Sequence, residues 1–194
     1  MLGSFLQRYP EIQLDLIESD SYSNLIDSRC DVAIRASSSL EDSSLHAIQF
    51  AHFTDCLCAT PEYLAANSHP TTIEDLLKLD WITHEVVHGT KQITLTSPKG
   101  QVTKVNKEPR IVVRNTHSLK ALVKNNLGFG ILPTFVIQKE LSSGSLLRLL
   151  PEIHSKPIPL YAVYQSKMHM PKRVRLLLDY LKTTKWSDET RGQK

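Results

Sequence analysis

The segment RIVVRNTHSLKALVKNNLGFGILP, residues 110–133, constrains the fold more than any other part of the sequence. Its first β-branched residues predict a strand, and Asn115 or Thr116 then caps a helix with apolar residues at helical spacing. Gly128 and Gly130 follow this helix and lead into a second apolar strand. They therefore mark a helix end, because a phosphate-binding loop would precede its helix. A strand, a helix and a strand in this order predict an α/β fold.

The rest of the chain repeats this alternation of strands and helices. Thr60 with Pro61 and Thr71 with Glu74 are typical starts of helices. We predict mainly parallel sheets, with local antiparallel pairing only within 81–113, where SPKG joins two strands of a hairpin. The predicted strands are 12–16, 31–35, 55–59, 81–83, 93–96, 101–105, 110–113, 129–133, 146–150 and 159–164. The predicted helices are 2–9, a short one from Asp20 or Ser21, 61–66, 72–78, 115–127, 135–141 and one from Pro171.

Composition places the chain among ordinary globular proteins. Apolar residues make up 41% and charged residues 22% of the 194 positions, enough for a sizeable core without a run of membrane-spanning length. A net charge of +3 is too small to indicate nucleic-acid binding, and the basic cluster 172–175 fits a solvated helix face. Three cysteines without metal or redox spacing predict reduced thiols and a cytoplasmic protein.

The stretch HEVVH at 84–88 fits the zinc-peptidase pattern, in which two histidines and a glutamate share one face of a helix. The surrounding residues oppose that helix, because Trp81 and Ile82 favour a strand and Gly89 follows at once. We predict a strand over 81–83 that runs into a loop, with no metal. No nucleophile with a placed base is apparent, so neither an enzyme nor a cofactor is expected; a zinc hydrolase remains the disfavoured alternative.

Several stretches, in their order and spacing, resemble the effector-binding domain of LysR-type transcriptional regulators. The resemblance covers residues 2–184 and rests on FLQRYPEIQLDL, DVAIRASSSLEDSSL, LCATPEYLA, VVRNTHSLKALVKNNLGFGILP, SGSLLRLLP, PLYAVY and PKRVRLLLDYL. It implies two Rossmann-like lobes of the type 2 periplasmic-binding-protein kind with an effector cleft between them. Lobe one would comprise 1–54 and 163–186, lobe two 55–162, and 187–194 would form a disordered tail.

The resemblance also implies a cytoplasmic homodimer or tetramer with no membrane contact. DNA would be read only through an N-terminal winged helix-turn-helix, for which this chain contains no match. Met1 already lies inside the first helix of the pattern, so we expect a fragment that also lacks one inner strand of lobe one, and hence poor solubility. An extracytoplasmic solute-binding protein of the same fold is the alternative.

The residues expected to bind the effector lie at helix starts and strand ends. Free backbone N–H groups at helix starts, hydroxyl groups and a guanidinium suit a small anion, most simply a carboxylate. Each hydroxyl can equally serve only as a cap, and Arg35 can equally pair with Glu41 or Asp42. By resemblance, the region of Thr83 and His84 faces the cleft. The expected set is Ser21, Arg35, Thr60, Thr83, His84, Asn115 and Thr116.

Overall fold

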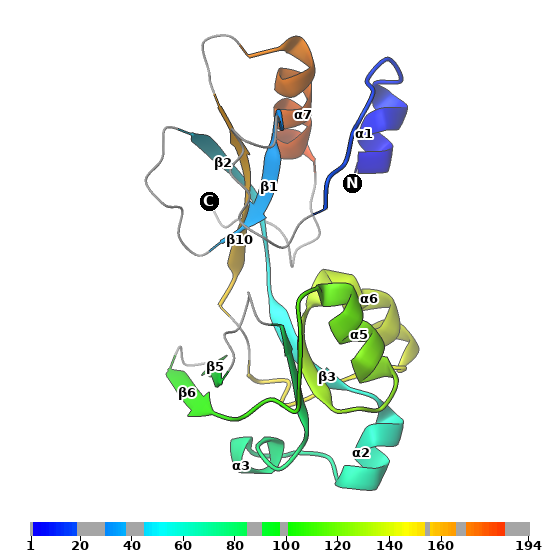
Figure 1. The fold of residues 1–194 in the computed structure, drawn as a ribbon, viewed down its shortest axis with the longest axis vertical. Helices are drawn as coiled ribbons and strands as arrows, with labels where there is room; N and C mark the ends of the chain where they lie inside the picture. Colours follow the sequence, from blue (N-terminus) through cyan, green and yellow to red (C-terminus); the bar gives the residue numbers. More distant parts are fainter. Residues whose placement is uncertain are drawn as a thin grey trace. The chain divides into compact units, whose positions relative to one another are not determined.

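The computed structural model describes residues 2–18, 30–37, 45–84, 91–97, 101–153, 156–165 and 170–184. The chain forms two compact units, traced in Figure 1: unit 1 is Met1–His52 with Ile158–Lys194, and unit 2 is Phe53–Pro157. The family resemblance implied lobe boundaries at 54/55 and 162/163, and the two units divide the chain at 52/53 and 157/158. Strand β10, Ile158–Tyr164, belongs to unit 1, where Leu160–Val163 pair with β1, Ala33–Ala36.

Unit 1 contains a three-stranded sheet in the order β1-β10-β2, where β2 is His46–Phe53. β1 and β10 are antiparallel, with Arg35 opposite Tyr161. Helix α7, Lys172–Thr183, covers the sheet because its apolar side chains recur at helical spacing. Helix α1, Leu2–Arg8, adds the ring of Phe5, 5.3 Å from that of Tyr180 on α7. The core of unit 1 consists of Phe50, Ala51, Ala162, Tyr164, Val174, Leu178 and Leu181.

One sequence prediction for unit 1 is wrong, and one strand was missed. Residues 12–16 alternate apolar and polar side chains but form no strand, and Leu14 and Leu16 are exposed. Alternation favours a strand only where a neighbouring strand supplies hydrogen bonds, and the sheet of unit 1 offers this segment none among the described residues. β2 was not predicted, because its apolar residues do not alternate regularly. The expected helix from Asp20 or Ser21 lies outside the described residues.

Unit 2 is built on a five-stranded sheet in the order β7-β4-β8-β3-β9. β4 runs parallel to β7 and β8, whereas β3 runs antiparallel to both β8 and β9. The prediction of mainly parallel sheets is therefore wrong, because alternating strands and helices do not by themselves determine strand direction. The strands are β3 Asp55–Ala59, β4 Trp81–His84, β7 Ile111–Val113, β8 Phe129–Pro133 and β9 Leu147–Arg148.

Helices and a hairpin cover this sheet much as the sequence predicts. The hairpin is antiparallel, as expected. The second helix is capped by Thr72, one residue after the predicted Thr71. Helix α5 ends at Lys124, before the predicted 127, and Asn126 has a left-handed φ of 62°. The elements are α2 Pro61–Asn67, α3 Ile73–Leu76, α5 Thr116–Lys124, α6 Thr134–Ser143, β5 Gln92–Thr96 and β6 Val102–Asn106.

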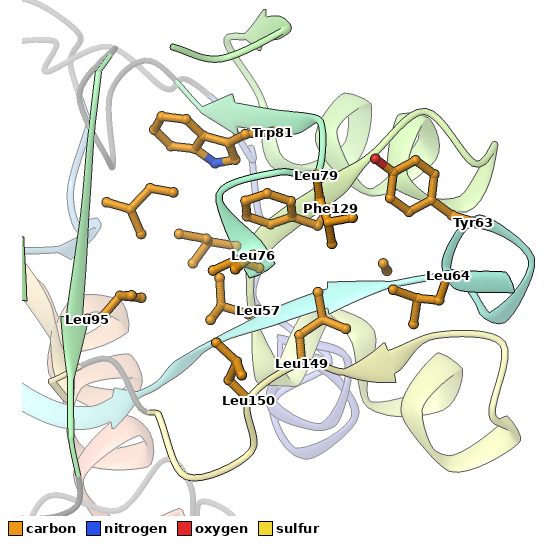
Figure 2. Packing of buried hydrophobic residues seen from close by; sticks show 13 residues of the cluster. Leu57, Tyr63, Leu64, Leu76, Leu79, Trp81, Leu95, Phe129, Leu149 and Leu150 are labelled. Carbon is orange, nitrogen blue, oxygen red and sulfur yellow. The ribbon is translucent and has the colours of Figure 1, made fainter. Parts of the chain in front are cut away.

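Each face of the unit 2 sheet has its own core. The face shown in Figure 2 holds Trp81 and Phe129 with the side chains of α2, α3 and β5. The other face packs Cys56, Cys58, Ile82 and Leu132 against α5 and α6. Gly128 has a φ of 153°, and a Cβ atom there would lie 2.4 Å from the Asp80 carbonyl oxygen, so no other residue fits.

Candidate functional site

The carboxyl ends of β7, β4 and β8 meet at one edge of the unit 2 sheet, because these three strands run parallel. His84, the last residue of β4, lies opposite Val113, and α5 begins three residues later at Thr116. On the other side Ile82 lies opposite Gly130, so the same register places His84 level with Leu132. Helix α6 then begins at Thr134. His84 is thus flanked by two helix starts.

The last two residues of β4 have buried polar side chains. Thr83 is 1% exposed and His84 is 3% exposed. Neither the Thr83 hydroxyl nor the two imidazole nitrogens of His84 has a hydrogen-bond partner among the described residues. Because buried polar atoms are nearly always paired in proteins, these atoms are available to a ligand or water.

Thr83 and His84 point to opposite faces of the sheet, because successive side chains alternate along a strand. Ile82 belongs to the core beneath α5 and α6, and His84, two residues on, shares its face. Trp81 belongs to the core shown in Figure 2, and Thr83 shares that face. The imidazole therefore lies on the side of the two helix starts, whereas the Thr83 hydroxyl lies on the other.

The start of α5 favours an anion. Asn115 caps the helix, and its side-chain oxygen accepts a hydrogen bond of 2.7 Å from the Ser118 N–H. Thr116, the first helical residue, is half-buried, and the cationic side chain of Arg114 is exposed just before the cap. A helix start carries a partial positive charge, so this end of the sheet combines dipole, hydroxyl and guanidinium.

The start of α6 is held in a different way. Its N-cap is Pro133, which supplies no side-chain hydrogen bond. Instead the backbone N–H and the hydroxyl of Thr134 both donate to the Thr54 carbonyl oxygen, at 2.9 and 2.7 Å. The two threonine hydroxyls are 3.3 Å apart. These contacts fix the first turn of α6 against the segment that enters β3.

The structure brings together only part of the predicted set. His84, Asn115 and Thr116 share one edge of unit 2, with Thr83 at that edge but on the opposite face. Thr60 caps α2, as expected, and bonds to Asn126. It lies at the far edge, because β3 runs antiparallel to β8 and ends beside its beginning.

The two remaining predicted residues belong to unit 1. Arg35 is a half-buried residue of β1. Ser21 lies outside the described residues, as do Glu41 and Asp42, the alternative partners of Arg35.

Asp55 is a buried polar residue at this edge that the sequence reasoning missed. It begins β3 opposite Pro133, is 4% exposed, and burial raises the pKa of its carboxyl from 3.8 to about 7. It shares the face of Leu57 and hence of Thr83, not that of His84. The signal in the sequence was an acidic residue leading directly into the apolar run CLCA.

The structure provides no support for the zinc pattern. The strand predicted for 81–83 is present but extends to His84, which was expected in the following loop, and His88 lies outside the described residues. In the described part of the chain no three His, Cys, Asp or Glu side chains are grouped to hold a metal ion. None of the described helices is long and apolar enough to cross a membrane.

Comparison with known proteins identifies what this architecture is similar to. Residues 1–186 match the family model of the LysR substrate binding domain. The chain is 31% identical to the HTH-type transcriptional regulator PtxR of Pseudomonas aeruginosa, over 93% of this chain and 57% of PtxR. It is also 31% identical to the HTH-type transcriptional regulator CrgA of Neisseria meningitidis, over 91% of this chain and 58% of CrgA.

Solved structures show the same relationship. The CrgA regulatory domain from Neisseria meningitidis superposes with a TM-score of 0.81 at 28% identity, covering 93% of this chain and 88% of that domain. The full-length virulence activator AphB of Vibrio cholerae gives a TM-score of 0.79 at 26% identity, covering 93% of this chain and 61% of AphB. The chain spans less than two thirds of these full-length regulators.

Proposed function

Because the chain belongs to the LysR substrate-binding domain family, we propose that it is the effector-sensing part of a longer LysR-type regulator and binds a small carboxylate. The two-lobed fold of its relatives is that of type 2 periplasmic binding proteins. We place the effector in the cleft that the family resemblance implies between the lobes. The names of the relatives describe transcriptional regulators, which favours neither a solute-binding protein nor a zinc hydrolase.

The observation that carries the proposal is the buried imidazole of His84 between two helix starts, whose nitrogens have no hydrogen-bond partner in the part of the chain that the structure describes. A carboxylate accepts hydrogen bonds only, so an imidazole N–H, a threonine hydroxyl and backbone N–H groups at a helix start complement it. Asp55 does not oppose this assignment, because its carboxyl lies on the other face and burial raises its pKa to about 7, which disfavours its charged form. His84 and Thr116 therefore supply the central contacts.

The function of the whole protein follows as part of the same proposal. A winged helix-turn-helix outside this chain would read the operator, and effector binding would alter that contact within a cytoplasmic dimer or tetramer. The relatives, whose names state that they are of the HTH type, support this arrangement. Arg35 of unit 1 is proposed as a further contact to the carboxylate.

A panel of small carboxylates tests the proposal. Thermal shift identifies a ligand, and calorimetry then compares the parent with His84→Leu, Thr116→Val and Arg35→Ala. Loss of a hydrogen bond to a charged group costs about 1.5–3 kcal/mol, so each variant should bind roughly ten- to a hundredfold more weakly. Thr60→Val, at the far edge of the sheet, should bind within about twofold of the parent. If both His84→Leu and Thr116→Val bind the ligand as tightly as the parent, the proposed site is wrong.

A further inference from the structure

An exposed aromatic ring lies in the first turn of α6. Phe135 is 51% exposed, whereas most large apolar side chains of unit 2 are buried. Among the described residues it is the one aromatic in the set of exposed large hydrophobic side chains, the others being leucine, isoleucine or valine. An aromatic ring left in solvent costs free energy that contact with a ligand would recover.

The ring of Phe135 is held in place from beneath. Its centroid lies 5.3 Å from that of Phe53, and the two planes meet at 82° in an edge-on contact. Phe53 is itself buried, at 6% exposure, and thus forms a fixed support. The neighbouring pair Thr54 and Thr134 is joined by two hydrogen bonds to the Thr54 carbonyl oxygen. A ring fixed in this way loses little conformational freedom when a ligand packs on it.

Phe135 also lies close to His84 in the topology of the sheet. His84 is level with Leu132 on the adjacent strand β8, and Phe135 follows Leu132 by three residues. The imidazole of His84, which has no hydrogen-bond partner among residues 45–84, 91–97 or the other described segments, thus lies at the same strand end as the exposed ring, with the start of α6 between them. One small molecule with a carboxylate at one end and an apolar body at the other would engage both.

We infer that Phe135 is a specificity-determining residue of the effector site and that the effector carries a flat apolar body, such as an aromatic ring, on its carboxylate. This inference rests on the carboxylate site proposed above and adds the chemistry of the remainder of the ligand. His84 and the start of α5 bind the charged end, while the face of Phe135 covers the apolar end. Small aliphatic acids satisfy only the first contact.

Benzoate and acetate test the inference, because they share a carboxylate and differ in the body attached to it. Calorimetry or NMR titration of the 194-residue chain should give at least a tenfold tighter binding of benzoate. Phe135→Ala should weaken benzoate binding about three- to tenfold and leave acetate binding unchanged, whereas Phe135→Tyr, which keeps the ring, should retain the preference. Val102→Ala on β6, another exposed apolar residue of unit 2, should change neither affinity.

The outcomes separate this inference from the function on which it rests. Equal affinity for the two probes, or an unchanged preference in Phe135→Ala with its melting temperature intact, would overturn the role of Phe135 while leaving the carboxylate site standing. Failure of the parent to bind either probe would overturn both. If Phe135→Ala weakens acetate and benzoate equally, the residue maintains the site and does not select its ligand, which also contradicts the inference.

Discussion

The two units of this chain bury their apolar residues to different extents. Unit 2 has a five-stranded sheet with a separate core on each face. In its described residues, unit 1 has a three-stranded sheet and one core beneath α7, while Leu14, Leu16, Ile17 and Ile34 are exposed. A sheet with cores on both faces buries more apolar surface than a sheet with a core on a single face, so unit 2 gains more free energy from burial than the described part of unit 1 does. The comparison indicates that unit 2 is more stable against unfolding than unit 1.

The largest effect is expected from removing a central side chain of unit 2. Phe129 is fully buried, and Phe129→Ala should lower the free energy of unfolding of unit 2 by about 3–5 kcal/mol, because a large cavity remains. Hydrogen exchange under increasing urea distinguishes peptides of the two units. In the parent, the amides of unit 1 should begin to exchange at a lower urea concentration than those of unit 2. In Phe129→Ala, the amides of unit 2 should exchange at the same urea concentration as those of unit 1 or at a lower one. Exchange of unit 2 before unit 1 in the parent would contradict the comparison.

The second effect is a pH dependence located in unit 2. Folding raises the pKa of Asp55 from 3.8 to about 7, so the unfolded chain loses this proton at lower pH than the folded chain. Stability is therefore greatest below about pH 4 with respect to this group and falls as the pH rises to about 7, by on the order of 2–4 kcal/mol in total.

Urea unfolding from about pH 4 to about pH 8 measures this loss. Asp55→Asn should flatten the dependence and be more stable than the parent at the upper end of this range. Asp75→Asn is the matched control: the Lys78 and Thr72 hydrogen bonds to this exposed carboxyl lower its pKa to about 2, so it titrates below the window. An unchanged slope in Asp55→Asn would show that Asp55 is not the group responsible.

A third, smaller effect separates stability from binding within unit 2. Thr60 and Asn115 both cap helices, so Thr60→Ala and Asn115→Ala should each cost about 1 kcal/mol, measured as a shift in melting temperature. Only Asn115→Ala should also weaken ligand binding, because Thr60 lies at the far edge of the sheet. Equal loss of affinity in both variants would mean that the two edges are not independent.

The smallest effect on stability is expected at the exposed leucines of unit 1. Leu16 is 61% exposed, so Leu16→Gln should change the free energy of unfolding by less than about 0.5 kcal/mol. The same change should reduce self-association, because exposed apolar side chains favour aggregation. Light scattering at increasing concentration checks this, with Lys78→Gln, just after α3, as an exposed control. A stability loss above about 1 kcal/mol would show that Leu16 is packed in solution.

The sequence predicted the elements whose signals are local. Thr60 with Pro61 and Asn115 supply their own caps, and residues 81–83 form the expected strand, whereas the helix that Gly128 was expected to end stops earlier, at Lys124. The errors concern interactions between distant segments. Residues 12–16 have a strand pattern but no neighbour to pair with among the described residues, and β3 runs opposite to the direction that alternation suggested.

The candidate site was predictable for the same reason only in part. A strand end and a helix cap can be recognised in the sequence, so the positions of Asn115 and Thr116 were predicted, and the family resemblance pointed to His84; that these residues bind an effector stays a prediction. Which edge of the sheet receives each cap depends on strand direction, and the antiparallel β3 sends Thr60 to the far edge. The burial of Asp55 and the exposure of Phe135 could not be predicted, because only the tertiary structure determines them.

The order of the strands has a consequence for synthesis on the ribosome. All strands of the unit 2 sheet lie within one uninterrupted segment, Phe53–Pro157. β1 of unit 1, in contrast, pairs within the described chain only with β10, which begins at Ile158. Unit 2 can thus fold before β10, the strand that pairs with β1, has left the ribosome. Domains commonly fold as such units during translation. A gene fragment encoding 53–157 is accordingly the natural one to express alone.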